Sequence, residues 1–436
     1  MGNKIQDEER HGGEMLHIEN DNVKKHILDG NFGLEKESLR ILRNGTLSHS
    51  LHPFPDDEYI VKDFCENQTE INTSVHTSAK EAIGELEFHN GRIHERLKKL
   101  TEREYLWPFS NPPYIENESD IPVAVFEGVE VSKTAYREYL SAKYGRYKMT
   151  FSGIHVNYSF SEHLLKIDFN LQEETDYQKY KNQFYLTLAQ KMAAYGWLLV
   201  AVTAASPLLD SSFVEKGIYD GDVFTGMASV RCGEMGYWNE FAPILDYNDI
   251  SAYADSIQKY VDMGLLKAAS ELYYPIRLKP SGENTLESLR KNGVNHIELR
   301  MFDLNPLADV GLEEKDVVFA QLLMVWLAST PNQPFSEKDQ IQAVQNFKNA
   351  ARYDLKTVNI LMPDGEIFSA ANAALKVIDK LKVFYSELGV DVNEVLQFEY
   401  EKFTDAENRY AWRIRKQFGN GYVKNALRFV KERQVN

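Results

Sequence analysis

Two glutamates, Glu35 and Glu37, are separated by one lysine in the stretch FGLEKESLR, residues 32–40. In a strand, side chains two residues apart project from the same face, whereas in a helix they point about 200° apart. As a helix, the stretch would be an ordinary solvated surface whose charges suit the helix dipole. As a strand, it would present two carboxylates side by side, as a metal-binding site requires. The arrangement of the other carboxylates decides between the two interpretations.

Two further stretches alternate apolar and polar residues, as strands with one buried face do. They are SGIHVNYS, residues 152–159, and NHIELRMF, residues 295–302. The apolar faces hold Ile154, Val156 and Tyr158 in the first and Ile297, Leu299 and Met301 in the second. The opposite faces hold Gly153, His155, Asn157 and Ser159, and His296, Glu298, Arg300 and Phe302. One such strand is ordinary solvent-facing alternation, but several with Glu, His and Arg predict a charged basin across a sheet.

The segment KDFCENQTEIN, residues 62–72, adds Asp63 and Glu70 as oxygen donors. Their odd spacing places them on opposite faces of a regular strand, so a bend or bulge must intervene for both to reach one site. Carboxylates with few histidines and no thiolate are the ligand set of Mg²⁺ or Mn²⁺. A surface charge is the commoner role for any single carboxylate, but the whole set favours a metal site.

Carboxylate clusters that face arginines are typical of sites that use ATP, where metals bridge the phosphates. The sequence contains no GxxxxGK[ST] motif and no GxGxxG motif that opens a strand-to-helix turn. Neither a P-loop nor a nucleotide-binding Rossmann domain is therefore expected. These observations predict an ATP site with several metal ions, carried by a sheet.

The amino-acid composition of the chain argues against several classes of protein. The chain has 436 residues, of which 43% are hydrophobic, and a formal charge of -16, which argues against both a disordered chain and a nucleic-acid binder. It has two cysteines, and its first residues contain no apolar signal segment. The uncharged run at residues 192–209 is interpreted as a buried core helix ending near Pro207 rather than a membrane span. We therefore expect a soluble cytoplasmic protein with reduced thiols and no membrane partner.

Helices and strands are predicted in alternation along the chain. The strands are expected at residues 35–41, 67–75, 152–159 and 296–302, and the helices at 79–101, 177–205, 312–328, 336–355 and 370–388. Without regular βαβ spacing, this order predicts an α+β fold with helices packed on a mixed sheet. Residues 1–20 are expected to form a loose tail, and residues 21–436 a single domain.

The stretch from residue 402 to 436 carries nine basic side chains against three acidic ones. On an acidic protein, this charge favours a helix packed over a complementary face. A role in holding a polyphosphate is the alternative.

Eight ordered segments carry a resemblance to a known family. They are FGLEKESLRI, DFCENQTEI, LWPFSNPPY, KTAYREYLSAKYG, SGIHVNYSF, SVRCGEMGYWN, ELYYPIRLKP and HIELRMFDLNPLADVGL. In this order they resemble the bacterial glutamate-cysteine ligases, or γ-glutamylcysteine synthetases, over about residues 32–326. The resemblance implies a distorted, mainly antiparallel sheet with helices packed on it, related to glutamine synthetase. It also implies a funnel-shaped active site on the concave face, and we expect a monomer.

The resemblance also implies roles for individual residues. The metal ligands, for roughly two to three Mg²⁺ ions that bridge the phosphates of ATP, would be Glu35, Glu37, Asp63, Glu70, His155 and Glu298. Arg300 and Arg231 would hold the glutamate substrate and the transferred phosphoryl group, so that Arg300, Arg231 and Glu298 form the catalytic set. The acceptor pocket would be lined by Tyr136, Tyr237, Phe64 and Leu140, together with Met149. Lys36 is expected to point to the other face of its strand and is not assigned to ATP.

The implied activity is ligation of the γ-carboxylate of L-glutamate to the amine of L-cysteine through a γ-glutamyl phosphate, at the cost of ATP. This is the first step of glutathione biosynthesis, and no covalent enzyme intermediate is needed, so Cys65 and Cys232 are interpreted as bystanders. Because no fused ATP-grasp half follows the matched segments, we expect only this first ligation.

Met149 departs from the family pattern, which has Gln six residues before the motif histidine. A γ-glutamyl ligase that uses a different amine is therefore the nearest alternative. A metal-dependent phosphohydrolase or a regulatory metal-binding module is the alternative from another class.

Overall fold

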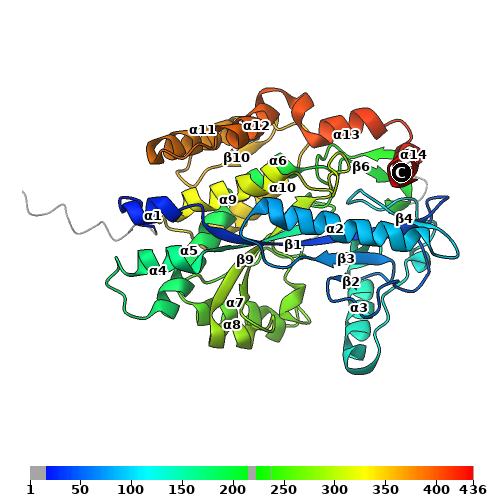
Figure 1. Ribbon diagram of the computed structural model, residues 1–436, viewed down its shortest axis with the longest axis horizontal. Helices are drawn as coiled ribbons and strands as arrows, with labels where there is room; N and C mark the ends of the chain where they lie inside the picture. The colour runs from blue at the N-terminus through cyan, green and yellow to red at the C-terminus, as the bar shows by residue number, and fades with distance from the viewer. Residues whose placement is uncertain (1–15, 215–221, 237, 436) are drawn as a thin grey trace, which may run out of the picture.

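The computed structural model describes residues 16–214, 222–236 and 238–435 (Figure 1). The strands are β1 Gly30–Leu42, β2 Ile60–Lys62, β3 Gln68–Asn72, β4 Glu104–Leu106, β5 Gly153–Phe160, β6 Leu208–Asp210, β7 Asp222–Phe224, β8 Ile276–Pro280, β9 Val294–Asp303, β10 Asn359–Leu361 and β11 Ile367–Ser369. The helices are α1 Asp21–His26, α2 Ala79–Lys98, α3 Val131–Tyr144, α4 Glu162–Phe169, α5 Tyr177–Tyr195, α6 Trp197–Thr203, α7 Ile250–Asp262, α8 Leu286–Asn292, α9 Glu314–Ala328, α10 Glu337–Ala350, α11 Ala370–Leu388, α12 Asn393–Thr404, α13 Tyr410–Phe418 and α14 Tyr422–Val435.

A seven-stranded sheet forms the centre of the protein, in the order β2-β3-β1-β5-β9-β8, with β4 paired to the far end of β1. All of its pairings are antiparallel. The predicted α+β fold, with helices packed on a mainly antiparallel sheet, is confirmed. All four predicted strands are present, and β1 is longer than expected because it pairs with β3, β4 and β5 along its length.

One face of the sheet is apolar and covered by helices. Ile154, Val156 and Tyr158 of β5 are each at most 1% exposed and belong to the main hydrophobic core. Helix α2 runs along β1 and β3, and α5 and α6 contact β9, while α9 packs behind them against α2, α5 and α6 (Figure 1). The alternate residues of β5, His155 and Asn157, are thereby directed to the opposite face.

A bulge in β9 changes the predicted alternation at one point. Ile154 of β5 pairs with Phe302 and Val156 pairs with Leu299, so two residues of β9 lie opposite His155 alone. Directly opposite residues of an antiparallel pair share a face, and each extra residue reverses the alternation. Phe302 was predicted on the polar face, and this was wrong: it lies opposite Ile154 in the hydrophobic core.

The helix predicted at residues 177–205 is divided into α5 and α6 at Gly196. A Cβ atom at this position would lie 2.6 Å from the carbonyl oxygen of Met192 and 2.9 Å from the ring of Phe347, so only glycine fits. Every residue of α6 is buried, as predicted for a core helix. Among the described helices, none combines the length and the apolar character that crossing a membrane demands.

The described part of the chain begins at a buried residue. Residues 1–15 of the expected tail lie outside the described residues, but Leu16 is fully buried and its N–H donates to the carbonyl of Ala328. The predicted division into a tail and one domain stays a prediction.

The basic stretch from residue 402 forms the end of α12 together with α13 and α14. Two of its cations meet acids of the body, since Lys402 pairs with Asp316 and Arg433 pairs with Asp309. At these two positions the stretch packs against acids as the charge pattern favoured, and a role in holding a polyphosphate stays a prediction.

Candidate active site

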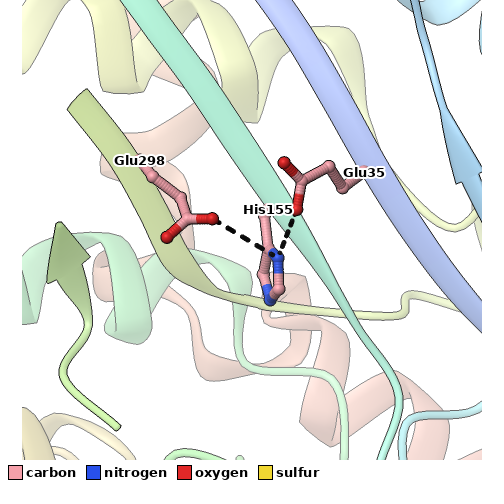
Figure 2. Close-up of side chains that lie close together, drawn as sticks. All are labelled: Glu35, His155 and Glu298. Atoms are coloured by element: carbon pink, nitrogen blue, oxygen red, sulfur yellow. Dashed lines mark hydrogen bonds and ion pairs between the residues drawn. The ribbon is translucent and has the colours of Figure 1, made fainter. Parts of the chain in front are cut away.

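Three strands bring Glu35, His155 and Glu298 together on the polar face of the sheet (Figure 2). Glu35 of β1 lies directly opposite His155 of β5, and Asn157 of β5 lies directly opposite Glu298 of β9. Nδ1 of His155 lies 2.9 Å from Oε2 of Glu35 and 4.0 Å from Oε1 of Glu298. One potential ligand atom from each of the three lies within 4.8 Å of those of the others.

Hydrogen bonds orient Glu35 and its neighbour Glu37. Nδ2 of Asn157 donates to Oε1 of Glu35 at 2.9 Å, and the N–H of Gly153 donates to Oε2 of Glu37 at 3.0 Å. Burial favours the protonated form of Glu35, but the hydrogen bond from His155, together with the charges of His155 and Lys279, lowers its pKa overall. Burial and the charge of Arg300 lower the pKa of His155. The neutral imidazole and the ionised carboxylate are the forms that bind metal ions.

Glu37, Glu70 and Asp63 form a second, adjoining group of carboxylates. Glu37 of β1 lies directly opposite Glu70 of β3, and Asp63 follows the last residue of β2. The bend predicted between Asp63 and Glu70 is the loop of the β2–β3 hairpin, in which Asp63 N–H donates to the carbonyl of Gln68. Burial and the neighbouring charge of Asp63 raise the pKa of Glu37 to about 8, and the same two effects raise the pKa of Glu70 well above its usual value. Such crowding of carboxylates favours a bound cation.

Arginine and lysine side chains balance the buried Glu298. Nη1 of Arg300 and Nζ of Lys279 each lie 3.1 Å from Oε1 of this carboxylate. Burial alone would raise the pKa of Glu298, but Arg300 and Lys279 hold it well below its usual range. The charges of Glu298 and Glu35 raise the pKa of Arg300 despite its burial. Glu298 is therefore ionised at neutral pH.

Arg231 reaches the same region from a loop after β7. Its guanidinium lies against Gly153, where a Cβ atom would be 2.2 Å from Cζ of Arg231. Glycine at the start of β5 is therefore required for this arginine to lie beside the sheet. Nη1 of Arg231 donates to the carbonyl of Phe302 at 3.3 Å, which orients the side chain.

A cavity of about 190 Å³ lies above these groups. It is lined by Glu37, Asp63, Phe64, Tyr136, Arg137, Leu140, Met149, Phe151, His155, Arg231, Ser270, Tyr273 and Arg300. The structure therefore brings together, at one cavity, members of the predicted metal, catalytic and acceptor-pocket sets. Tyr237, also predicted for the acceptor pocket, lies outside the described residues. The metal and substrate roles of all these residues stay predictions.

The structure adds residues that the sequence did not assign to the site, among them Lys279, Asn157, Arg137 and Tyr273. Lys279 and Asn157 alternate with buried residues on β8 and β5, so strand periodicity was an available signal. Arg137 donates from Nε to the carbonyl of Asp63 at 2.7 Å. It follows Tyr136 on α3, whose position over the sheet no local pattern indicates.

The residues present fit a divalent cation. Both carboxylate oxygens of Glu298 are buried, and Oε1 lies 3.1 Å from both Arg300 and Lys279. A buried, ionised carboxylate beside a neutral imidazole and a second carboxylate forms an O/N donor set that Mg²⁺ or Mn²⁺ accepts.

Both cysteines are free and buried. Burial raises the pKa of Cys232 to about 12, and its Sγ donates to the carbonyl of Met301 at 3.2 Å. Burial likewise raises the pKa of Cys65 well above its usual value. Neither thiol has the lowered pKa of a nucleophile.

The structure was also compared with solved structures. It superposes on a glutamate-cysteine ligase from Francisella tularensis, solved in complex with AMP, with a TM-score of 0.82 and 23% identity over 93% of this chain and 88% of that one. A bifunctional glutathione synthetase from Pasteurella multocida gives a TM-score of 0.83 and 24% identity over 97% of this chain and 55% of that one. At these identities the likeness establishes the fold.

Similarity in sequence identifies the family of this chain as well as its fold. The glutathione biosynthesis bifunctional protein of Listeria monocytogenes is 33% identical over 423 residues, which cover 93% of this chain and 54% of that protein. The corresponding protein of Clostridium perfringens is 30% identical, over 95% of this chain and 55% of that protein. The chain thus spans about half the length of these relatives. The family model for glutamate-cysteine ligase matches residues 15–265 and 247–350. This chain belongs to the glutamate-cysteine ligase family.

Proposed function

We propose that the protein joins the γ-carboxylate of L-glutamate to the amine of L-cysteine, with hydrolysis of ATP to ADP and phosphate. The observation that carries the proposal is the cavity in which Glu37 and Asp63 face Arg231 and Arg300. It combines carboxylates for metal-bound phosphates with guanidinium groups for a carboxylate substrate or a phosphoryl group. The names of the relatives support the same reaction as the first step of glutathione biosynthesis.

The polar face of the sheet holds the metal ions in this proposal. Glu35, His155 and Glu298 provide one group of ligands, and Glu37, Asp63 and Glu70 the other. Bound Mg²⁺ or Mn²⁺ would neutralise the phosphates of ATP and polarise the transferred group. Asn157 orients Glu35, while Lys279 and Arg300 keep Glu298 ionised before any cation arrives.

Arg300 and Arg231 act on the glutamate substrate and on the phosphoryl group. Both guanidinium groups line the cavity, and the charge of Arg300 is secured by Glu298. They bind the carboxylates of glutamate and offset the negative charge that spreads over the transferred phosphoryl oxygens.

The reaction proceeds in two steps. A γ-carboxylate oxygen of glutamate attacks the γ-phosphorus of ATP, the bond to the bridging oxygen breaks, and ADP leaves. The amine of the acceptor then attacks the acyl carbon, loses a proton, and displaces inorganic phosphate. No side chain of the protein forms a covalent bond, in agreement with the raised pKa of both thiols.

One residue, Met149, is also compatible with an acceptor amine other than that of L-cysteine. Met149 is 3% exposed and lines the cavity beside Leu140 and Phe64, where it provides an apolar surface. The Sγ of cysteine suits such a surface, but so does the side chain of another small apolar amine. A γ-glutamyl ligase with a different acceptor uses the same first step.

The test is ADP release from MgATP and L-glutamate with L-cysteine, with L-2-aminobutyrate, with a panel of other amines, or without an acceptor. We expect release that requires both glutamate and cysteine, with 2-aminobutyrate as a weaker acceptor. Preference for another amine would retain the chemistry and change the acceptor. Release that ignores glutamate would overturn the proposal in favour of a phosphohydrolase. Gel filtration with light scattering of the same preparation tests the proposed monomer, which we place in the cytoplasm.

A further inference from the structure

A second pocket, which contains Lys36, lies on the opposite face of the sheet from the candidate active site. Lys36 lies between Glu35 and Glu37 on β1, and its side chain points to the helix-covered face, as predicted from the alternation. The residue is 6% exposed. Its Nζ donates to Oδ1 of Asn90 on α2 at 2.8 Å, and within the described part of the chain it forms no ion pair. A buried ammonium group with only a neutral partner carries a large desolvation cost.

A second cation, Arg433 of α14, lines the same pocket. Its Nη1 donates to the carbonyl of Pro306 at 2.8 Å, and its Nη2 pairs with Asp309. Asp309 also lines the pocket, and its side chain is 88% exposed, so this ion pair is weakened by solvent. Burial and the positive charge of Arg433 lower the pKa of Lys36 to about 7.

Neutral groups complete the pocket. Nδ2 of Asn90 donates to Nε2 of His94 at 3.0 Å, so the neutral imidazole carries its proton on Nδ1. Burial and the charge of Lys36 lower the pKa of His94 to about 4, so it adds no positive charge at pH 7. Ser38 and Gln434 also line the pocket. The pocket therefore holds two cations, of which, among the described residues, only Arg433 pairs with a carboxylate, and the rest of its lining is largely apolar.

The pocket has a volume of about 230 Å³ and shares no lining residue with the cavity of the candidate active site. One molecule of liquid water occupies about 30 Å³. The pocket is several times larger, so a small ligand fits beside Lys36. It is walled by β1, α2, α14, the segment 106–108 at the end of β4 and the segment 304–311. Elements far apart in the sequence thus converge on one buried ammonium group.

We propose that this pocket binds a small oxyanion, a phosphate or a carboxylate, between Lys36 and Arg433. An oxyanion supplies the negative charge that Lys36 lacks and accepts charge-assisted hydrogen bonds from both side chains. Asp309 opposes this binding, because its carboxylate competes for Arg433. The inference does not depend on the ligase reaction, since it concerns the other face of the sheet.

Isothermal titration calorimetry with inorganic phosphate, in a metal-free buffer of low ionic strength, tests the proposal, with succinate as the carboxylate probe. The wild-type protein is expected to bind at least one of the two probes, and the stronger one identifies the chemistry. Lys36→Met and Arg433→Gln are each expected to weaken that affinity about tenfold or more, because each removes a hydrogen bond to a charged group. Asp309→Asn is expected to strengthen it about threefold, since it frees Arg433.

Two control variants test whether the probe binds in this pocket or elsewhere on the protein. Lys80→Met removes an exposed lysine from the start of the same helix α2 and is expected to leave the affinity unchanged. Arg231→Gln tests whether the probe binds in the candidate active site instead. The proposal is overturned if the wild-type protein binds neither probe, if Arg433→Gln and Asp309→Asn leave the affinity unchanged, or if only Arg231→Gln abolishes it. Because Asp309 is exposed, Asp309→Asn gives a result even if Lys36→Met does not fold.

Discussion

Glu35 and His155 occupy directly opposite positions on β1 and β5, and Nδ1 of the imidazole donates to Oε2 of the carboxylate at 2.9 Å. The contact therefore depends on strand register, because a slip of one strand by one residue would send its side chain to the helix-covered face and separate the pair. The same register places Asn157 two residues further along β5, where it donates to the other oxygen of Glu35. This part of the site is thus built from paired strands.

Asn157→Ala should weaken metal binding without removing a proposed ligand. The substitution releases Oε1 of Glu35 from its hydrogen bond at 2.9 Å. Loss of a partner that orients a ligand typically weakens metal affinity about 10- to 100-fold. Titration with Mn²⁺, followed by electron paramagnetic resonance without nucleotide, measures the change. Asn31→Ala is the matched control, since Asn31 on β1 contacts Ser159 instead. Equal Mn²⁺ affinity in all three proteins would contradict the proposed role of Glu35.

Glu298→Gln should abolish turnover while the protein stays folded. The substitution keeps the shape of the side chain but removes the charge that faces Arg300 and Lys279. We expect the rate of ADP release to fall about 10²-fold or more, as when a group that acts on the developing charge is lost. Far-ultraviolet circular dichroism and thermal unfolding check the fold.

Glu283→Gln serves as the control for this change, because Glu283 is an exposed carboxylate in the segment between β8 and α8. Its activity is expected to equal that of the wild-type protein. Normal turnover by Glu298→Gln would remove Glu298 from the catalytic set.

The sequence predicted the part of the site that depends on strand periodicity. Alternation placed Glu35, His155 and Glu298 on polar faces, and their strands are adjacent in the sheet. It failed at Phe302, because a bulge depends on pairing between strands and leaves no trace in the alternation of one strand. Lys279 was missed although it alternates with buried residues on β8, a strand of five residues.

The residues of the acceptor pocket were harder to predict from the sequence. Tyr136 and Leu140 lie on α3, and Arg231 lies in a loop, so their convergence depends on tertiary packing. Only the resemblance to a family indicated them. The pocket behind β1 was missed for the same reason, since Lys36 and Arg433 are distant in the sequence.

Met149→Gln should change the choice of amine. The substitution places an amide in the apolar part of the cavity, which is formed by Met149, Leu140 and Phe64. We expect the ratio of kcat/KM for L-cysteine to that for L-2-aminobutyrate to change about tenfold, the effect of one hydrogen bond in a buried site. The KM values for ATP and glutamate should stay the same.

Met149→Leu is the matched control for shape, because it keeps the apolar surface. Its acceptor ratio is expected to stay within about twofold of the wild-type value. A ratio that does not change in Met149→Gln would show that this residue does not contact the acceptor.

The two thiols should be unreactive in the folded protein. With its pKa raised to about 12 by burial, only about one Cys232 side chain in 10⁴ is a thiolate at pH 8. Cys65 is fully buried as well. Ellman's reagent is therefore expected to react with neither cysteine over minutes at pH 8, and with both in guanidinium chloride. Rapid modification accompanied by loss of ADP release would show that a thiol contributes to the site.

Lys402→Met should strongly destabilise the packing of the helices α6, α9 and α12 around this lysine. Nζ of Lys402 lies 2.7 Å from Oδ1 of Asp316 on α9 and 2.8 Å from Oε2 of Glu399 on α12, and it also donates to the carbonyl of Val202 on α6 at 3.1 Å. All three ionisable side chains are at most 2% exposed. Methionine has a similar length but leaves two buried carboxylates without a cation.

Removing one member of a buried ion pair costs about 3–5 kcal/mol, because the remaining charge stays buried without compensation. Urea unfolding, followed by circular dichroism, is expected to show this loss. Lys416→Met on α13 removes a lysine that pairs with Glu407 at the surface, and it should leave the unfolding midpoint almost unchanged. Equal stability of the two variants would mean that water reaches Asp316 and Glu399. The packing of α9, α12 and α6 around Lys402 would then be looser than the buried ion pairs require.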